Sequence, residues 1–190
     1  MPNWCNNIVE LSAENAEDLS KLKEMIGNKD HPFDFQKIKP MPESLSITSG
    51  SDEMGYDAKY GDFKRMLEYP WVKEKGVETQ QELIDFLIAD YPEIMEKAEI
   101  YKSNVDKYGH KSWYGWCTEN WGTKWSVSAE DIVVEDLGNY MRLTFNTAWS
   151  PAEGIYEALV LIIDEHNLGI TVTWFYDEPG MQFAGYLGAA

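Results

Sequence analysis

The chain has 190 residues, of which 44% are hydrophobic and 26% charged, which is enough for a real core and argues against disorder of the whole chain. Its 33 acidic and 16 basic residues leave a formal net charge of −17, so direct binding to the phosphates of duplex DNA is disfavoured. No apolar run approaches the roughly 20 residues that span a bilayer, and we expect no membrane contact.

The negative charge is concentrated toward the C-terminus. Residues 126–190 hold ten acidic residues and one basic residue, Arg142, whereas residues 1–125 hold 23 acidic and 15 basic residues. Such a surface can simply keep a cytoplasmic protein soluble. The alternative is that the carboxylates imitate nucleic-acid phosphates and occupy the basic groove of another protein, which requires them to cluster on one face.

The cysteines and the N-terminus indicate a reduced, cytoplasmic protein. Cys5 and Cys117 have no metal-binding or redox spacing, although a disulfide between them stays open. The N-terminal residues contain neither the basic nor the apolar stretch of a signal peptide.

The first third of the chain predicts a strand, a helix and a covering segment. Alternation predicts a strand over 7–12, followed by a helix that begins after Ser12 or Asn15 and runs to about Ile26. Residues 33–42 are too rich in proline for a central strand, so we expect them to lie over the core. The apolar stripe of the helix consists of Leu19, Leu22 and Ile26, and the covering side chains are Phe33, Phe35 and Ile38.

The middle of the chain reads as helical. Residues 43–61 are rich in Ser, Gly and Asp and are expected to form a surface loop, and residues 60–67 predict a short helix that Pro70 interrupts. The segment Thr79–Glu82 is a capping box that opens a longer helix. Pro92 is expected to bend or split that helix.

Strand patterns return after the Trp-rich segment. Residues 125–127 and 132–134 read as strand on either side of a break, and a turn at 136–139 leads into a strand over 140–149. The predicted buried face of that last strand consists of Met141, Leu143, Phe145, Thr147 and Trp149.

The C-terminal part predicts a helix and two strands. Ser150, Pro151 and Glu153 combine an N-cap serine, a first-turn proline and a capping-box glutamate. Strands are then predicted over 170–176 and 181–187. Without the helical middle, the order is βαββαβ, an α+β ferredoxin-like antiparallel sheet with helices on one face and an extra C-terminal strand. We therefore expect a single domain, residues 1–190, with a helical insertion at about 30–124.

The densest aromatic segment is the candidate site. Four of the eight tryptophans fall between Trp113 and Trp125, and they could form a platform for a base or sugar, a protein-binding hot spot or ordinary core. Their place where the insertion returns to the sheet favours a structural junction, with Trp113 and Trp116 partly exposed to a partner. The candidate binding residues are Trp113, Tyr114, Trp116, Trp121, Lys124 and Trp125.

Five short motifs carry a resemblance to a known family. They are Met1–Asn7, the Phe-x-x-Ile-x-Pro-Met-Pro segment at 35–42, Asn120–Trp125, Phe145–Pro151 and Glu178–Gly185. In this order they resemble the YubB-like family of phage and plasmid proteins with a ferredoxin-like domain. The resemblance implies that fold and a mobile-element source in the cytoplasm of a bacterial host. It brings no assigned activity, so it implies no catalytic residue.

The residues point to no catalytic, metal or cofactor site. His31, His110 and His166 are scattered, and no zinc, phosphate-loop or nucleophile-elbow motif is present. We therefore expect a non-enzymatic acidic interaction protein of a phage or mobile element. Its expected partner is a host protein, such as a nucleic-acid-binding or defence factor. The protein would bind this partner, and binding could also inhibit it. The alternative is a small-ligand or single-stranded nucleic-acid binder that uses the Trp cluster or a sheet face whose aromatics are ringed by Lys or Arg.

Overall fold

The computed structural model describes residues 3–188, so Met1 and Pro2 of the first motif lie outside it. The chain divides into two compact units. The sheet unit contains the chain through Met41 and from Cys117 onward, and the insertion unit contains Pro42–Trp116. The insertion is therefore shorter than the expected 30–124. Residues before 42 belong to the sheet unit because Phe33 and its neighbours pack into the core of that unit.

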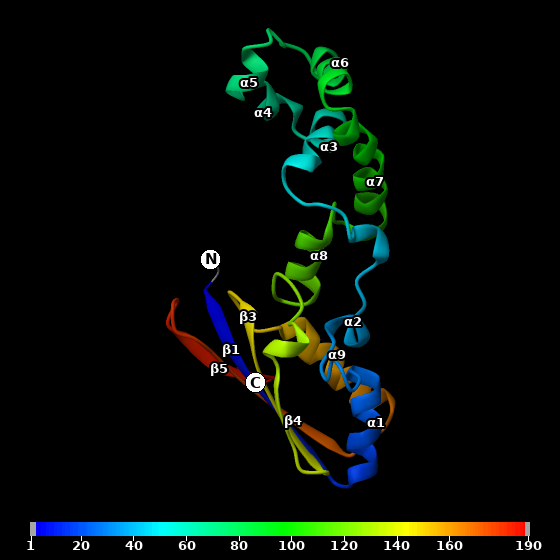
Figure 1. The fold of residues 1–190 in the computed structure, drawn as a ribbon, viewed down its shortest axis with the longest axis vertical. Helices are drawn as coiled ribbons and strands as arrows, with labels where there is room; N and C mark the ends of the chain where they lie inside the picture. Colours follow the sequence, from blue (N-terminus) through cyan, green and yellow to red (C-terminus); the bar gives the residue numbers. More distant parts are fainter. Residues whose placement is uncertain (1–2, 189–190) are drawn as a thin grey trace. The chain divides into compact units, whose positions relative to one another are not determined.

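The sheet unit is built on one five-stranded antiparallel sheet (Figure 1). The strand order is β2-β3-β1-β4-β5, so the fold is α+β, and the fifth strand at the edge departs from a plain four-stranded ferredoxin-like order. The strands are β1 (Trp4–Ala13), β2 (Val133–Asp136), β3 (Tyr140–Ala148), β4 (Ile170–Glu178) and β5 (Phe183–Leu187).

Helices pack on one face of this sheet (Figure 1). They are α1 (Ala16–Ile26), α2 (Phe35–Ile38) and α9 (Glu153–Glu165), whereas α8 (Trp113–Asn120) crosses the boundary between the units. The side chain of Asn15 accepts a hydrogen bond from the backbone of Asp18, which confirms Asn15 rather than Ser12 as the N-cap of α1.

The core of the sheet unit follows the two-residue period of its strands. Val9 on β1 lies opposite Leu143 on β3 and Trp174 on β4, and all three are fully buried beneath the helices. Phe33 packs against Phe145 and Trp174, with ring centroids 5.5 and 5.9 Å apart. The predicted apolar stripe of α1 and the covering role of residues 33–42 are both confirmed.

The insertion unit is helical. Its segments are η1 (Glu43–Leu45), η2 (Ser51–Glu53), α3 (Met54–Lys59), α4 (Phe63–Leu67), α5 (Pro70–Lys73), α6 (Gln80–Asp90) and α7 (Pro92–Tyr108). The capping box of Thr79 and Glu82 forms as predicted. Pro92 splits the predicted long helix by opening α7, and Pro70 likewise opens α5. The expectation of a surface loop at 43–61 is wrong. Leu45 and Ala58 are fully buried, and they lie in the short helices η1 and α3.

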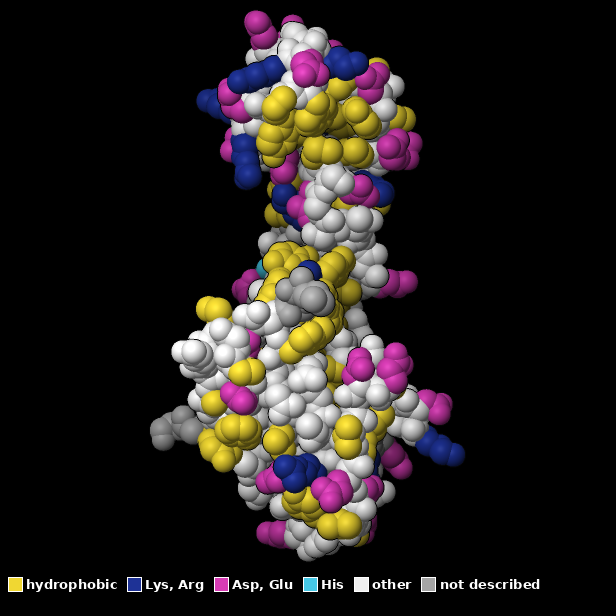
Figure 2. All heavy atoms as spheres, turned by 60° about the vertical axis from the view of Figure 1, so that its left-hand side comes forward, with side chains coloured by type: hydrophobic (Ala, Val, Ile, Leu, Met, Phe, Trp, Pro, Cys, Tyr) yellow, Lys and Arg dark blue, Asp and Glu magenta, His cyan; other side chains and the backbone are white. Residues whose placement is uncertain are grey.

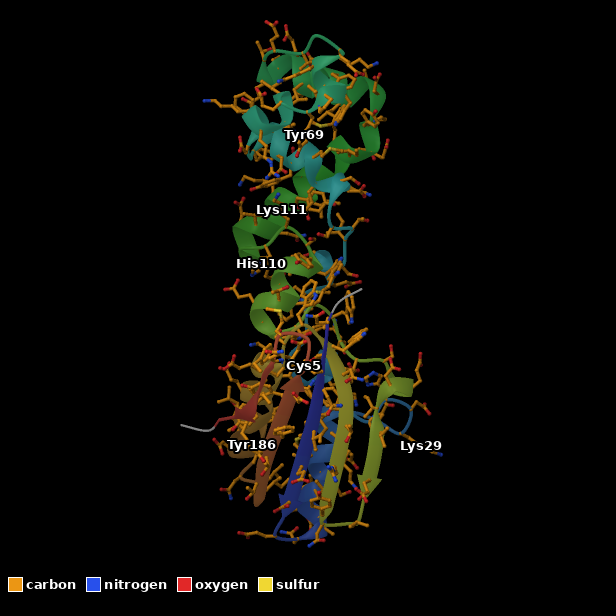
Figure 3. The ribbon with its side chains drawn as sticks, turned by 90° about the vertical axis from the view of Figure 1, so that its left-hand side faces the viewer. Cys5, Lys29, Tyr69, His110, Lys111 and Tyr186 are labelled. Atoms are coloured by element: carbon orange, nitrogen blue, oxygen red, sulfur yellow. The ribbon has the colours of Figure 1, made fainter. Side chains whose placement is uncertain are left out.

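Ion pairs supplement the core of the insertion unit. The Lys111 ammonium lies 2.7 Å from Asp57 and 3.2 Å from Glu53, and Lys97 pairs with Asp52 (Figure 3 labels Lys111). Burial alone would lower the pKa of Lys111, but the hydrogen bonds to the two carboxylates outweigh it and raise the pKa above its usual value. These pairs connect η2 to α7, and they connect η2 and α3 to the chain that follows α7.

Several boundaries in the C-terminal half differ from the predictions. Residues 125–127 lie outside any strand, β2 begins at Val133, and β5 begins at Phe183. Helix α9 begins at Glu153, one residue after Ala152. Ser150 does not cap it, because the Ser150 hydroxyl donates instead to the carbonyl oxygen of Gly122 at 2.6 Å. Within residues 3–188, none of the helices is long and apolar enough to cross a membrane.

Candidate binding surface

The predicted aromatic cluster is divided between the two units. Trp113, Tyr114 and Trp116 belong to the insertion unit, whereas Trp121, Lys124 and Trp125 belong to the sheet unit. Each group is therefore a separate candidate. The Trp113 and Tyr114 rings pack edge to face at 5.7 Å, and Trp113 is partly exposed as expected.

Two of the predicted binding residues are core residues instead. Trp121 is only 3% exposed, its indole N–H donates to the carbonyl oxygen of Lys39 at 2.8 Å, and its ring packs on Phe35. Trp116 is 8% exposed, so the expectation of partial exposure is wrong. Both rings are inaccessible to a partner, because burying their large aromatic area is energetically more favourable than leaving it at the surface.

Lys124 and Trp125, which are half-buried, form a cluster with two exposed tryptophans from elsewhere in the chain. The Lys124 ammonium lies 4.5 Å from the ring centroid of Trp125 and 5.1 Å from that of Trp149. The Trp4 ring packs edge to face against Trp125 at 6.5 Å. Trp4 is 48% and Trp149 39% exposed. We call these four residues the Trp–Lys surface.

Trp149 is displayed by an unusual backbone conformation. Its φ is +71°, in the left-handed region that bulky residues rarely adopt, and its backbone N–H donates to the carbonyl oxygen of Asn3 at 2.9 Å. The sequence placed Trp149 on the buried face of the strand, which is wrong. Strand β3 ends at Ala148, so the alternation stops and the indole is turned outward. Strain of this kind costs about 1–3 kcal/mol and is often kept at binding sites.

A buried polar network lies behind the Trp–Lys surface. Asn7 accepts a hydrogen bond from the Trp174 indole at 2.9 Å and donates one to the Thr147 hydroxyl at 2.8 Å. Thr147 donates to the carbonyl oxygen of Ser150, and Thr123 donates to that of Ala148. The network joins β1, the end of β3 and the Gly-Thr-Lys turn, so these motif residues have a structural role.

The Glu-Pro-Gly motif is structural as well. The carboxylate of Glu178 is fully buried at the end of β4 and accepts the backbone N–H of Gly180 at 3.1 Å and that of Met181. It therefore satisfies donors that the turn before β5 would leave unpaired.

Neither cysteine resembles a catalytic thiol. Both thiols are free and buried, so the disulfide left open by the sequence is not formed. Burial raises the pKa of Cys5 to about 11 and that of Cys117 to about 12. Within residues 3–188, no group of three or more His, Cys, Asp or Glu side chains could hold a metal ion.

The native thiols should therefore react slowly. We expect alkylation of Cys5 and Cys117 by iodoacetamide at about pH 8 to be roughly 100-fold slower than in concentrated guanidinium chloride, because little thiolate forms and access is closed. Mass spectrometry at timed intervals measures both rates. Comparable rates in the folded and unfolded protein would contradict the burial of these thiols.

Acidic residues predominate in both units. The sheet unit carries 18 acidic and seven basic residues, and the insertion unit 15 and nine. Figure 2 shows Asp and Glu side chains dispersed over one face of each unit and interleaved with Lys and Arg. This face offers no support for the alternative in which clustered carboxylates imitate nucleic-acid phosphates.

One hollow of the sheet unit lies beside α1. It measures about 650 Å³ and is lined by Lys23, Lys29 and Lys37 together with Asp136 (Figure 3 labels Lys29). Lys23 bonds Asp136 at 2.7 Å, and Lys37 donates to the carbonyl oxygen of Gly27 at 2.6 Å. Two of the lysines that line this hollow therefore already have structural roles. Lys23 pairs with Asp136 of β2, and Lys37 caps the C-terminal end of α1.

Comparisons with known proteins assign no family. No family model matches the chain, and no curated protein does. Among solved structures, the chain is similar to the crystal structure of protein api92 from Yersinia pseudotuberculosis, of the DUF1281 family model. The identity is 13%, the match covers 98% of this chain and 93% of that chain, and the TM-score is 0.48. A likeness this distant carries no argument about function.

Proposed function

We propose that this protein is a non-enzymatic interaction protein that binds another protein through the Trp–Lys surface. The observation that carries the proposal is Trp149, a large ring that is 39% exposed on a left-handed backbone, with the Lys124 ammonium 5.1 Å from its centroid. Tryptophans on a rigid support dominate the energetics of many interfaces, because they bury a large area at little cost in conformational entropy.

The charge of the sheet unit indicates the kind of partner. With 18 acidic and seven basic residues, this unit would attract a protein with a basic groove and repel nucleic acid. Together with the resemblance to phage and plasmid proteins, this supports a host factor as the partner, such as a nucleic-acid-binding or defence protein. Binding of this kind would also inhibit a partner whose basic groove it covers.

We also assign the sheet unit to the ferredoxin-like class. The order β2-β3-β1-β4, with α1 after β1 and α9 after β3, supports a split βαβ topology. Strand β5 is then an addition at the edge.

Trp149→Gly tests the proposed surface without disturbing the fold. Glycine adopts positive φ freely, so this change removes the ring and relieves backbone strain together. We expect the variant to keep the stability of the wild type and to lose about 30-fold or more in affinity for the partner. The measurement is capture from a bacterial lysate on immobilised protein, followed by titration of the captured protein.

Leu161→Ala is the matched control, because Leu161 is 58% exposed on α9, outside the Trp–Lys surface. It should bind like the wild type, and added salt should weaken binding of a basic partner. Equal binding by Trp149→Gly and the wild type would overturn the proposed surface. Binding that is insensitive to salt would overturn the proposed partner chemistry.

A further inference from the structure

Within the described part of the sheet unit, no helix covers the face of the sheet opposite α1 and α9 (Figure 3). Side chains at alternate positions of each strand point to this face, and they include Ile8 of β1, Thr144 of β3 and Phe175 of β4, which lie side by side in register. Tyr186 of β5 lies opposite Phe175 and is 57% exposed. The face therefore presents aromatic rings on hydrogen-bonded, paired strands.

A hollow of about 240 Å³ lies in the middle of this face. Phe175 and Tyr186 form one wall, with ring centroids 5.3 Å apart and planes inclined by 60°. The hollow is smaller than the roughly 300 Å³ at which pockets for drug-sized ligands begin, so it suits a single flat ring system. Its lining residues are Ile8, Glu10, Arg142, Thr173, Phe175 and Tyr186.

The opposite wall carries an incompletely paired Arg142 and Glu10. The Nε atom of Arg142 is buried, lies 3.8 Å from a carboxylate oxygen of Glu10, and has no hydrogen-bond partner among the residues that the structure describes. Tyr140 donates to the same Glu10 oxygen at 2.9 Å. The two side chains remain 41% and 37% exposed. A ligand in the hollow therefore meets a cationic donor beside an anionic acceptor.

The chemistry of this pair selects one edge of a planar heterocycle. A carboxylate with two oxygens is best satisfied by two adjacent N–H donors, and a guanidinium by a neighbouring carbonyl oxygen. Guanine offers this combination, with its O6 acceptor beside the N1 and N2 donors. Adenine does not offer this combination, because the corresponding edge has one donor next to an acceptor and no second adjacent donor. Aromatic side chains stack bases of any kind, so Phe175 and Tyr186 would supply affinity while Glu10 and Arg142 supply selectivity.

The surrounding charge disfavours phosphates. Glu135 lies in register with Arg142, and Asp177 follows Phe175 on the same face of β4. The sheet unit as a whole has a large excess of acidic residues, and phosphate-backbone binding needs the reverse. A sheet that binds single strands requires a ring of Lys or Arg around its aromatic residues. The described strands do not place such a ring around Phe175 and Tyr186.

We propose that this hollow binds the guanine base of a free nucleoside, stacked on Phe175 and Tyr186 and hydrogen-bonded by Glu10 and Arg142. This site lies on the sheet face and is independent of the protein-binding role of the Trp–Lys surface.

Titration of the isotope-labelled full chain with guanosine tests the proposal directly. We expect chemical-shift changes at Ile8, Arg142 and Phe175. The affinity for adenosine should be about tenfold lower than that for guanosine. The affinity for inosine should lie between the two, because inosine lacks only the N2 donor of guanosine. Guanosine monophosphate and a guanine-containing single strand should bind more weakly than guanosine. Shifts confined to other residues, or none at millimolar guanosine, would overturn the site.

Variants separate stacking from edge recognition. Tyr186→Leu should weaken guanosine and adenosine alike by about tenfold, whereas Glu10→Gln should remove the preference for guanosine. Phe183→Leu is the matched control on β5, since Phe183 packs on Tyr176 instead, and it should bind like the wild type. Retained preference in Glu10→Gln would overturn the recognition of guanine. Tighter binding of the single strand than of guanosine would overturn the free-nucleoside assignment.

Discussion

Asn7→Ala should lower the free energy of unfolding by about 3 kcal/mol. Asn7 is fully buried, and its amide holds the Trp174 indole at 2.9 Å, the Thr147 hydroxyl at 2.8 Å and the carbonyl oxygen of Cys5 at 2.9 Å. Alanine leaves these groups without their partner and without water, and each unsatisfied buried group costs about 1–3 kcal/mol. Urea unfolding followed by circular dichroism measures the loss.

Asn6→Ala is the control for this prediction. The Asn6 side chain lies on the open face of the sheet, where it meets Asn146 at 3.4 Å in an exposed contact, so its removal should change stability by about 0.5 kcal/mol at most. A double-mutant cycle of Asn7→Ala with Trp174→Phe should show coupling, because phenylalanine removes the donor that Asn7 satisfies. Similar losses for Asn6→Ala and Asn7→Ala would refute the importance of the buried network.

Gly154→Ala should destabilise the protein by about 3 kcal/mol or more, or prevent it from folding. A Cβ atom at Gly154 would lie 1.9 Å from the carbonyl oxygen of Asn120, a backbone atom that cannot rotate away. The gain of about 1 kcal/mol that alanine normally brings within a helix is outweighed by this overlap. Thermal unfolding of the soluble fraction, together with its yield, measures the effect.

Gly115→Ala provides the comparison, because the added Cβ atom would meet only the side chain of His110, at 3.0 Å. That side chain can shift, so we expect a neutral or slightly stabilising change. If Gly154→Ala were as stable as the wild type, the close approach of α9 to the end of α8 would be wrong.

Local signals predicted much of the secondary structure. The cap at Asn15, the capping box at Thr79–Glu82 and the split at Pro92 all act within one helical turn, so they can be read without knowledge of the fold. The alternation of β3 likewise predicted which residues face the core as far as Thr147.

The candidate site was predicted only in part, since tryptophan density does not distinguish core from surface. Trp121 and Trp116 are buried, whereas Lys124 and Trp125 are half-buried members of the Trp–Lys surface. Trp4 and Trp149 were missed as its members. The Ser-Pro that follows Trp149 was the available signal, because it ends the strand and with it the alternation that buries every second residue.

The sequence by itself determined the order of the main strands and helices of the sheet unit, the core-facing stripe of α1 and the excess of negative charge, because each depends on residue type and on neighbours a few positions away. Only the tertiary structure decided that Trp149 turns outward, that Ser150 bonds Gly122 and that Arg142 lies beside Glu10 and two aromatic rings. These outcomes depend on strand register and on contacts between segments more than 20 residues apart. Such contacts form only when the whole sheet unit folds, and they place the side chains on which both proposals rest.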